Sequence, residues 1–183
     1  MTVLPVRQYY LQVDSQTRHS YRMCFSSTCA MAVKYLMPEA LKGSNADDVY
    51  LKTVLKYGDT TDANAQIRAC RDFGVVAQFH KNGSKATIQS ELKQGYPVAT
   101  GILHHGPVDS PTGGGHWMLC IGDTGEYGVF HDPYGEMDNI NGGYVRVGSG
   151  GQNVQYSWRN WLKRWEVDGP KSGWFMTFRR THD

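Results

Sequence analysis

The chain has 183 residues, of which 40% are apolar and 20% charged, so it can build a hydrophobic core without disulfide bonds. Its formal net charge of +2 excludes binding to nucleic acid or to anionic membranes driven by net charge alone. No apolar run approaches the roughly 20 residues of a membrane span, and the first residues show no signal-peptide pattern. We therefore expect one domain, residues 1–183, synthesised in the cytoplasm, and we favour a monomer.

Helical periodicity dominates the first half of the chain. After a segment, Tyr9 to Gln16, that predicts an edge strand or an extended arm, apolar residues from Cys29 to Met37 recur at three- and four-residue steps. Ser26 to Thr28 supply candidate N-caps, so this helix would begin near Ser26, with Cys24 at its N-terminal end. Three more helices are expected: one from Ser44 that ends at Gly58, one after Thr61 that ends at Gly74, and one from Ile88 to Gln94.

Short apolar runs between glycine-containing turns dominate the second half. A tryptophan-rich helix from Ser157 to Trp165 would place Trp158, Trp161 and Trp165 on one face, most simply as core. Helices followed by antiparallel strands predict the α+β class. The expected strands are Pro97–His104, His116–Gly122, Tyr127–His131, Tyr144–Val147 and Gly173–Phe178.

The four cysteines are interpreted as reduced thiols. Cys29, Cys70 and Cys120 fall on apolar faces, where a thiol is most simply a small core residue. Cys24 differs because a helix N-terminus lowers the pKa of a thiol and favours the nucleophilic thiolate. The alternative interpretation of Cys24 is a buried thiol near a helix start.

His116 and Asp132 supply the base and the orienting group that a cysteine nucleophile needs. If Asp123-Thr124-Gly125 forms a three-residue hairpin loop, His116 lies directly opposite Asp132 on the same face. The glycines at 113–115 would leave the imidazole unshielded and give a substrate backbone room to approach. The alternative is a histidine with a satisfied hydrogen bond at a sheet end.

Several other features have simpler interpretations than a second site. A zinc site could use His104, His105, His116 and His131 with Asp132, but adjacent histidines in a strand point to opposite faces, and no H-E-x-x-H signature occurs. The pair Asp47-Asp48 is interpreted as helix-start charge rather than a catalytic dyad. The loop from Gly106 to Gly115 could be a mobile lid or a rigid connector.

Five short motifs follow one another along residues 12 to 135. In this order they resemble the motifs Q-x-D-N, C-G-P-T-S-x-A-M, G-Y-P-V, G-H-W and D-P-Y-G of the bacteriocin-leader-peptidase-like cysteine peptidases of the papain superfamily. Each motif is short, but the order and the Cys-His-Asp succession are specific together. The matching residues are Gln12-Val13-Asp14-Ser15, Cys24 with Ala30-Met31, Gly95-Tyr96-Pro97-Val98, Gly115-His116-Trp117 and Asp132-Pro133-Tyr134-Gly135.

The resemblance implies a role for each matching residue in a papain-like fold, in which the helix that begins with the nucleophile packs on a twisted antiparallel sheet. Cys24 would be the nucleophile, His116 the general base and then acid, and Asp132 the group that holds the imidazole. Gln12 would donate to the oxyanion together with the Cys24 backbone N–H. Gln16 is a competing donor, although the x-Asp-Ser context follows only Gln12.

The sequence departs from the family pattern at two places. Phe25-Ser26 stands where the family has Gly-Pro after the cysteine, so the resemblance does not describe this turn. The stretch between Gln12 and Cys24 carries an insertion with Arg18, His19 and Arg22, which we expect to shape a substrate groove.

The resemblance implies a peptidase or amidase that forms a thioester acyl-enzyme and needs no cofactor. A compact version without an attached transporter resembles the cell-wall peptidases of bacteriophages, so the expected substrates are peptidoglycan stems or cross-links, reached after release or delivery. The alternatives are a catalytically silent binding or virion structural module, with the glycine-rich half as docking surface, and a zinc-dependent peptidase.

Overall fold

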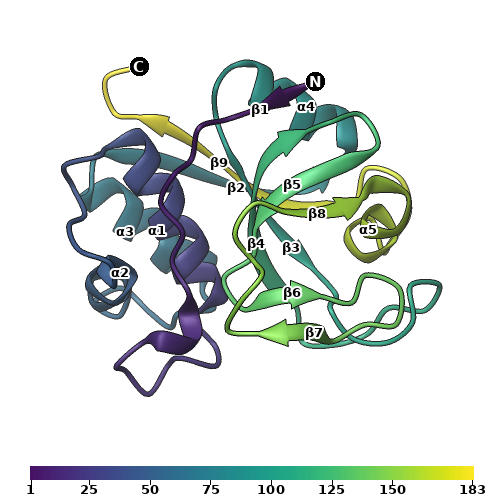
Figure 1. Ribbon diagram of the computed structural model, residues 1–183. Helices are drawn as coiled ribbons and strands as arrows, with labels where there is room; N and C mark the ends of the chain where they lie inside the picture. The colour runs from purple at the N-terminus through teal and green to yellow at the C-terminus, as the bar shows by residue number, and fades with distance from the viewer.

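The computed structural model describes residues 1–183 (Figure 1). The helices are α1 (Cys24–Leu36), α2 (Ala46–Val54), α3 (Ala63–Asp72), α4 (Lys85–Lys93) and α5 (Trp158–Trp165), with a short 3-10 helix η1 (Gln12–Asp14). The strands are β1 (Thr2–Val3), β2 (Val75–Gly83), β3 (Val98–Ile102), β4 (His116–Asp123), β5 (Tyr127–His131), β6 (Gly135–Met137), β7 (Tyr144–Val147), β8 (Val154–Ser157) and β9 (Gly173–Arg180).

Seven strands form one antiparallel sheet. Its order is β2-β9-β3-β4-β5-β8, with β1 paired to β4, while β6 and β7 form a separate pair. The last strand in sequence, β9, therefore lies inside the sheet between β2 and β3. The mixture of helices and an antiparallel sheet confirms the α+β class.

Helix α1 is the central helix of the fold. Figure 1 shows α1, α2 and α3 together on one side of the molecule, beside the sheet, and α1 contacts β3, β4 and β9. Ten of its thirteen residues are buried, because its sequence is small or apolar on nearly every face. The buried helix holds its first residue, Cys24, at a fixed place beside the sheet.

The hydrophobic core is one cluster of 38 buried residues that draws on both the helices and the sheet. The side chains of Trp158, Trp161 and Trp165 are 3%, 0% and 1% exposed, which confirms that this helical face is core. None of the helices combines the length and the apolar character that crossing a membrane requires.

Two local expectations were wrong. Of the two alternatives for Tyr9–Gln16, the edge strand does not form: the segment is an arm outside the sheet that contains η1. Helix α1 begins at Cys24 with Met23 as its N-cap, so Ser26 to Thr28 lie inside the helix rather than capping it. The hydroxyls of Ser26 and Ser27 have distant partners instead, Thr60 Oγ1 at 2.8 Å and Asp47 Oδ2 at 2.7 Å.

Strands β1, β2, β6 and β8 were missed by the sequence analysis. β2 carries little alternation in its second half, where several polar residues are exposed or half-buried, so its sequence lacks the period-two pattern of a strand. Its pairing with β9, more than ninety residues later, supplies what the local pattern does not.

Candidate active site

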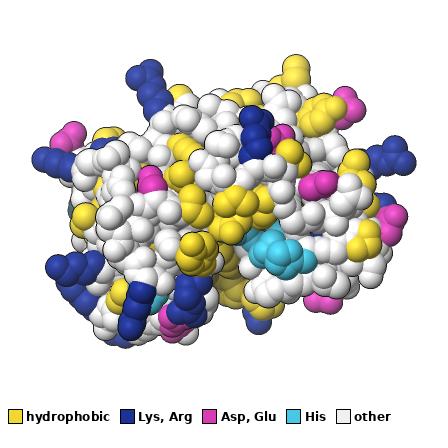
Figure 2. Space-filling view, turned by 60° about the horizontal axis from the view of Figure 1, so that its bottom comes forward, with side chains coloured by type: hydrophobic (Ala, Val, Ile, Leu, Met, Phe, Trp, Pro, Cys, Tyr) yellow, Lys and Arg dark blue, Asp and Glu magenta, His cyan; other side chains and the backbone are white.

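A cleft of about 790 Å³ opens at the N-terminal end of α1. Its other walls come from the end of β3, the start of β4, the end of α5 and the start of β9. Figure 2 shows hydrophobic side chains gathered beside histidines on this face of the molecule. Gln12, Cys24 and His116 all line the cleft, as do Tyr21 and Arg22 from the inserted stretch before Cys24.

Cys24 is a free, half-buried thiol in the first turn of α1. Burial alone would raise the pKa of the Cys24 thiol, but hydrogen bonding to His116 and the imidazolium charge oppose it. Hydrogen bonds from the backbone N–H groups of Trp117 and Phe25 add to these effects, and the net pKa lies below its ordinary value. The environment therefore favours the thiolate, the form that attacks carbonyl carbon.

His116 is bonded to Asp132 as well as to Cys24. Its Nε2–H donates to Asp132 Oδ1 at 2.7 Å, and the two side chains are 4% and 0% exposed. Nδ1 is thus the ring nitrogen left for Cys24. Burial acts to lower the pKa of His116, but the Asp132 carboxylate and Cys24 outweigh it and raise the pKa to about 10.

The predicted hairpin register between His116 and Asp132 was wrong. Leu119 pairs with His131 and Asp123 with Gly128, with a bulge between Cys120 and Gly122, so the loop is longer than three residues. His116 pairs instead with Ile102 of β3. The imidazole still reaches Asp132, because the aspartate lies just beyond the end of β5.

Two tyrosines that the sequence analysis missed complete the surroundings of Asp132. Tyr156 donates to Asp132 Oδ2 at 3.0 Å, and Tyr144 donates to Oδ2 at 3.2 Å while its ring packs against His116 at a centroid distance of 5.6 Å. Burial and the nearby Asp132 charge raise the pKa of both hydroxyls, which keeps them protonated. No motif marks them, since their strands lie beyond the motif residues.

Of the two candidate oxyanion donors, only Gln12 lines the cleft. Gln12 is 1% exposed, and its Nε2 donates to the backbone carbonyl of Ser20 at 3.0 Å, while its Oε1 has no partner. Gln16 is exposed, and its Nε2 donates to the carbonyl oxygen of Asp14 at 3.1 Å. The geometry therefore favours Gln12.

His104 and His105 do not behave as strand neighbours. Both follow the end of β3, and their rings lie 3.9 Å apart, so the expectation that they point to opposite faces was wrong. Burial, with the charges of His116 and His105, lowers the pKa of His104 to about 3. No three His, Cys, Asp or Glu side chains are grouped as ligands of a metal ion.

The Gly106–Gly115 loop is held in place by Arg164, a buried residue of α5. Its guanidinium donates to the carbonyl oxygens of His105 and Gly106 at 3.1 and 2.9 Å, and to that of Asn139 at 3.0 Å. His105 and Thr112 also exchange two backbone hydrogen bonds. These contacts favour the rigid connector over the mobile lid.

The remaining three cysteines, Cys29, Cys70 and Cys120, are buried and free, as expected for core thiols.

Comparisons with known proteins identify this fold. A model of the Peptidase_C39 like family matches residues 6–169. A C39-like peptidase from Bacillus anthracis shares 12% identity over 98% of each chain, with a TM-score of 0.62. The peptidase domain of Streptococcus ComA, a bifunctional ABC transporter involved in quorum sensing, shares 15% identity over 95% of this chain and 99% of that one, with a TM-score of 0.56.

A third solved structure is a double glycine motif protease from an AMS/PCAT transporter in complex with the leader peptide. It shares 14% identity over 99% of each chain, with a TM-score of 0.51. No curated protein sequence matches the chain. The fold and the family match together define a papain-like cysteine peptidase. The chain belongs to the Peptidase_C39 like family, which confirms the resemblance drawn from its motifs.

Proposed function

We propose that this protein hydrolyses peptide bonds with Cys24 as nucleophile, His116 as general base and acid, and Asp132 as the residue that orients the imidazole. The observation that carries the proposal is the 2.7 Å bond from His116 Nε2 to Asp132 Oδ1. Because this bond occupies Nε2, the other ring nitrogen, Nδ1, faces the Cys24 thiol, whose pKa is already lowered.

In the first step, the Cys24 thiolate attacks the carbonyl carbon and forms a tetrahedral oxyanion. As the C–N bond breaks, the His116 imidazolium gives its proton to the leaving amine, and a thioester remains on Cys24. Neutral His116 then takes a proton from water, which attacks the thioester. Release of the carboxylic acid product restores the thiolate and the imidazolium.

Two donors would stabilise the oxyanion in both steps. The Cys24 backbone N–H is in the first turn of α1, where it has no partner within the helix. The side-chain amide of Gln12 lines the same cleft and has a second Nε2 hydrogen beyond the one given to Ser20. Preorganised donors of this kind typically contribute 10²–10³-fold each.

The surroundings of the cysteine favour an enzyme over a catalytically silent module. A buried carboxylate and imidazolium are costly to desolvate, and a docking surface has no use for them. The Cys24–His116–Asp132 series is supported by Tyr144 and Tyr156, which hold the buried carboxylate by its second oxygen.

For the substrate we propose the stem or cross-link peptides of peptidoglycan, reached after release or delivery of the protein to the wall. The support is the resemblance to stand-alone phage enzymes. Gly113 to Gly115 line the cleft entrance, and they give a peptide backbone room to approach His116. Leader peptides, the partner in one of the solved structures, are the competing class.

One experiment tests both parts. Purified peptidoglycan and a synthetic peptide with a double-glycine motif are each incubated with wild type and with Cys24→Ala, and released fragments are identified by mass spectrometry. We expect new amine and carboxyl ends from peptidoglycan with wild type only. Cleavage of the double-glycine peptide alone would show that the substrate is a leader-type peptide and not peptidoglycan. Cleavage by Cys24→Ala would exclude the cysteine mechanism.

Cys120→Ala is the matched control for the loss of a thiol. Cys120 is buried in β4 and does not line the cleft, so this variant should release the same fragments as wild type.

A further inference from the structure

The segment that leads to Gln12 is tied to the segment that contains Asp132. We call residues 4–12 the N-terminal strap; Figure 1 shows it in purple, running from β1 across the molecule beside α1. His131 Nε2–H donates to the Val6 carbonyl at 2.8 Å, and the Gln12 N–H donates to the Pro133 carbonyl at 2.8 Å. With the Tyr9 contact described next, the strap meets residues 131 to 133 at three points, Val6, Tyr9 and Gln12.

Tyr9 makes the middle contact. Its hydroxyl donates to the backbone carbonyl of Asp132 at 2.6 Å, and its ring packs edge-on against His131 at a centroid distance of 5.6 Å. Of the three contacts, this is the one in which a strap side chain reaches Asp132 itself. Burial, together with the Asp132 charge, raises the pKa of Tyr9, so the hydroxyl stays a donor.

The space around the Tyr9 hydroxyl is closed by Gly151. A Cβ atom at Gly151 would lie 2.6 Å from the Tyr9 hydroxyl oxygen and overlap the Asp132 carbonyl oxygen. The carbonyl of Gly151 also accepts the Asp132 N–H at 2.8 Å. Tyr9 and Gly151 therefore bind the backbone of Asp132 through its carbonyl and its N–H respectively.

We propose that Tyr9 is a positioning residue that fixes Gln12 relative to Asp132, so that the oxyanion donor and the imidazole are held as one unit. The inference rests on the proposed function, because it assigns Gln12 to the oxyanion and Asp132 to His116. A shift of Gln12 away from the cleft costs transition-state stabilisation but not ground-state binding.

Tyr9→Phe tests the proposal, because it keeps the ring against His131 and removes only the hydroxyl. With the peptide that wild type cleaves fastest, we expect kcat to fall about tenfold while KM stays unchanged. Alkylation of Cys24 by iodoacetamide forms no oxyanion, so its rate should equal that of wild type. An aldehyde analogue of the same peptide should lose affinity in parallel with kcat.

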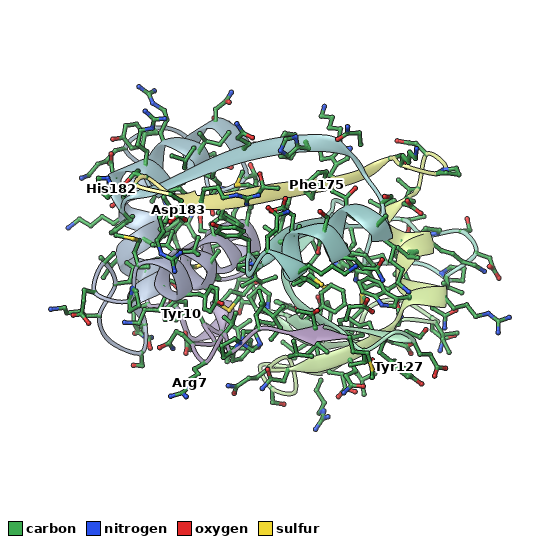
Figure 3. All side chains as sticks on the ribbon, turned by 90° about the horizontal axis from the view of Figure 1, so that it is seen from above. Arg7, Tyr10, Tyr127, Phe175, His182 and Asp183 are labelled. Carbon is green, nitrogen blue, oxygen red and sulfur yellow. The ribbon has the colours of Figure 1, made fainter.

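Tyr10→Phe is the matched control within the strap. The Tyr10 hydroxyl is buried without a hydrogen-bond partner, so its removal should leave kcat unchanged. Figure 3 shows Tyr10 further inside the molecule than Arg7 of the same strap.

A double-mutant cycle separates positioning from a general structural effect. In a Gln12→Ala background, Tyr9→Phe should cost nothing further. Full additivity of the two losses would overturn the proposal, as would an unchanged kcat in Tyr9→Phe or a slower alkylation of Cys24. Hydrolysis that persists in Cys24→Ala would instead refute the proposed function, and the inference with it.

Discussion

The rings of Phe25 and Trp117 stack face to face, with centroids 3.8 Å apart and planes 2° from parallel. Phe25 follows Cys24 at the start of α1, and Trp117 follows His116 at the start of β4. The stack therefore joins the helix and the strand one residue beyond the thiol and the imidazole. Phe25 stands where the family motif has glycine, and here its ring supplies the stacking partner of Trp117.

Restoring the family glycine is expected to harm this protein. Phe25→Gly removes a side chain that is 2% exposed, so the free energy of unfolding should fall by about 3–5 kcal/mol. Urea denaturation measures the change. Val145→Ala is the control: the Val145 side chain is 62% exposed, so this variant should change the stability by about 0.5 kcal/mol or less. A Phe25→Gly variant as stable as wild type would contradict the role of the stack.

The pH dependence of peptide hydrolysis should be bell-shaped, and the loss of activity on the alkaline side should occur at high pH. The pKa of Cys24 is lowered, so the thiolate is lost only as the pH falls below that lowered pKa. The pKa of His116 is raised to about 10, so the imidazolium is lost as the pH rises through about 10. Profiles of kcat/KM against pH measure both limbs.

Asp132→Asn tests the assignment of the alkaline limb. Because the Asp132 charge is the main contribution that raises the pKa of His116, this limb should move to lower pH in the variant. An alkaline limb that stays in place would assign it to a group other than His116.

Arg164→Lys should loosen the connector beside the cleft. Lysine keeps the charge but lacks the fork of donors that contacts His105, Gly106 and Asn139, so buried carbonyls lose their partners. We expect a loss of about 3 kcal/mol, from buried acceptors left without donors, and faster hydrogen exchange at the backbone amides of His105 and Thr112. Arg159→Lys, at an exposed position of the same helix, should change neither quantity. Exchange that stays slow in Arg164→Lys would show that the loop is held by other contacts.

Asp47→Asn should stabilise the protein selectively at higher pH. Burial is the main cause that raises the pKa of Asp47 to about 7, so the folded state keeps a proton that the unfolded chain releases near its ordinary pKa. This contribution to stability is present at low pH and is lost as the pH rises toward 7. Asparagine removes the dependence and still accepts the Ser27 hydroxyl.

The measurement compares unfolding free energies at pH 5 and pH 8. Relative to wild type, Asp47→Asn should gain about 3 kcal/mol between the two values, from roughly 1.4 kcal/mol per pH unit over the two units below a pKa of about 7. Asp168→Asn, at an exposed carboxylate, should show no such gain. A difference of the opposite sign would mean that Asp47 is ionised in the folded protein at pH 5.

Features of the fold that depend on short-range pattern were predictable from the sequence. The bounds of β5 and β7 were predicted as they occur, and the tryptophan face of α5 was predicted as core. The register of β4 on β5 was not, because the bulge between Cys120 and Gly122 shifts it by an amount that no local signal sets.

The residues of the candidate site also divide into those that the sequence predicted and those that it did not. Motif order led to Gln12, Cys24, His116 and Asp132. The structure places the first three on one cleft and Asp132 behind His116, bonded to it. Tyr9 and Tyr156 could not be found, since each acts through a hydrogen bond to a residue far away in the chain. Their contribution depends on tertiary contacts, which neither periodicity nor spacing encodes.

The place of β9 within the sheet has a consequence for when the protein can finish folding during its synthesis. Because β9 separates β2 from β3, the sheet stays in two pieces until residues 173–180 have been synthesised and inserted. Trp174 of this strand also lines the cleft, so the substrate site lacks a wall until then. Contacts of such long sequence separation form late in folding. A nascent chain would therefore carry Cys24 through the synthesis of residues 25–180 without a finished cleft around it.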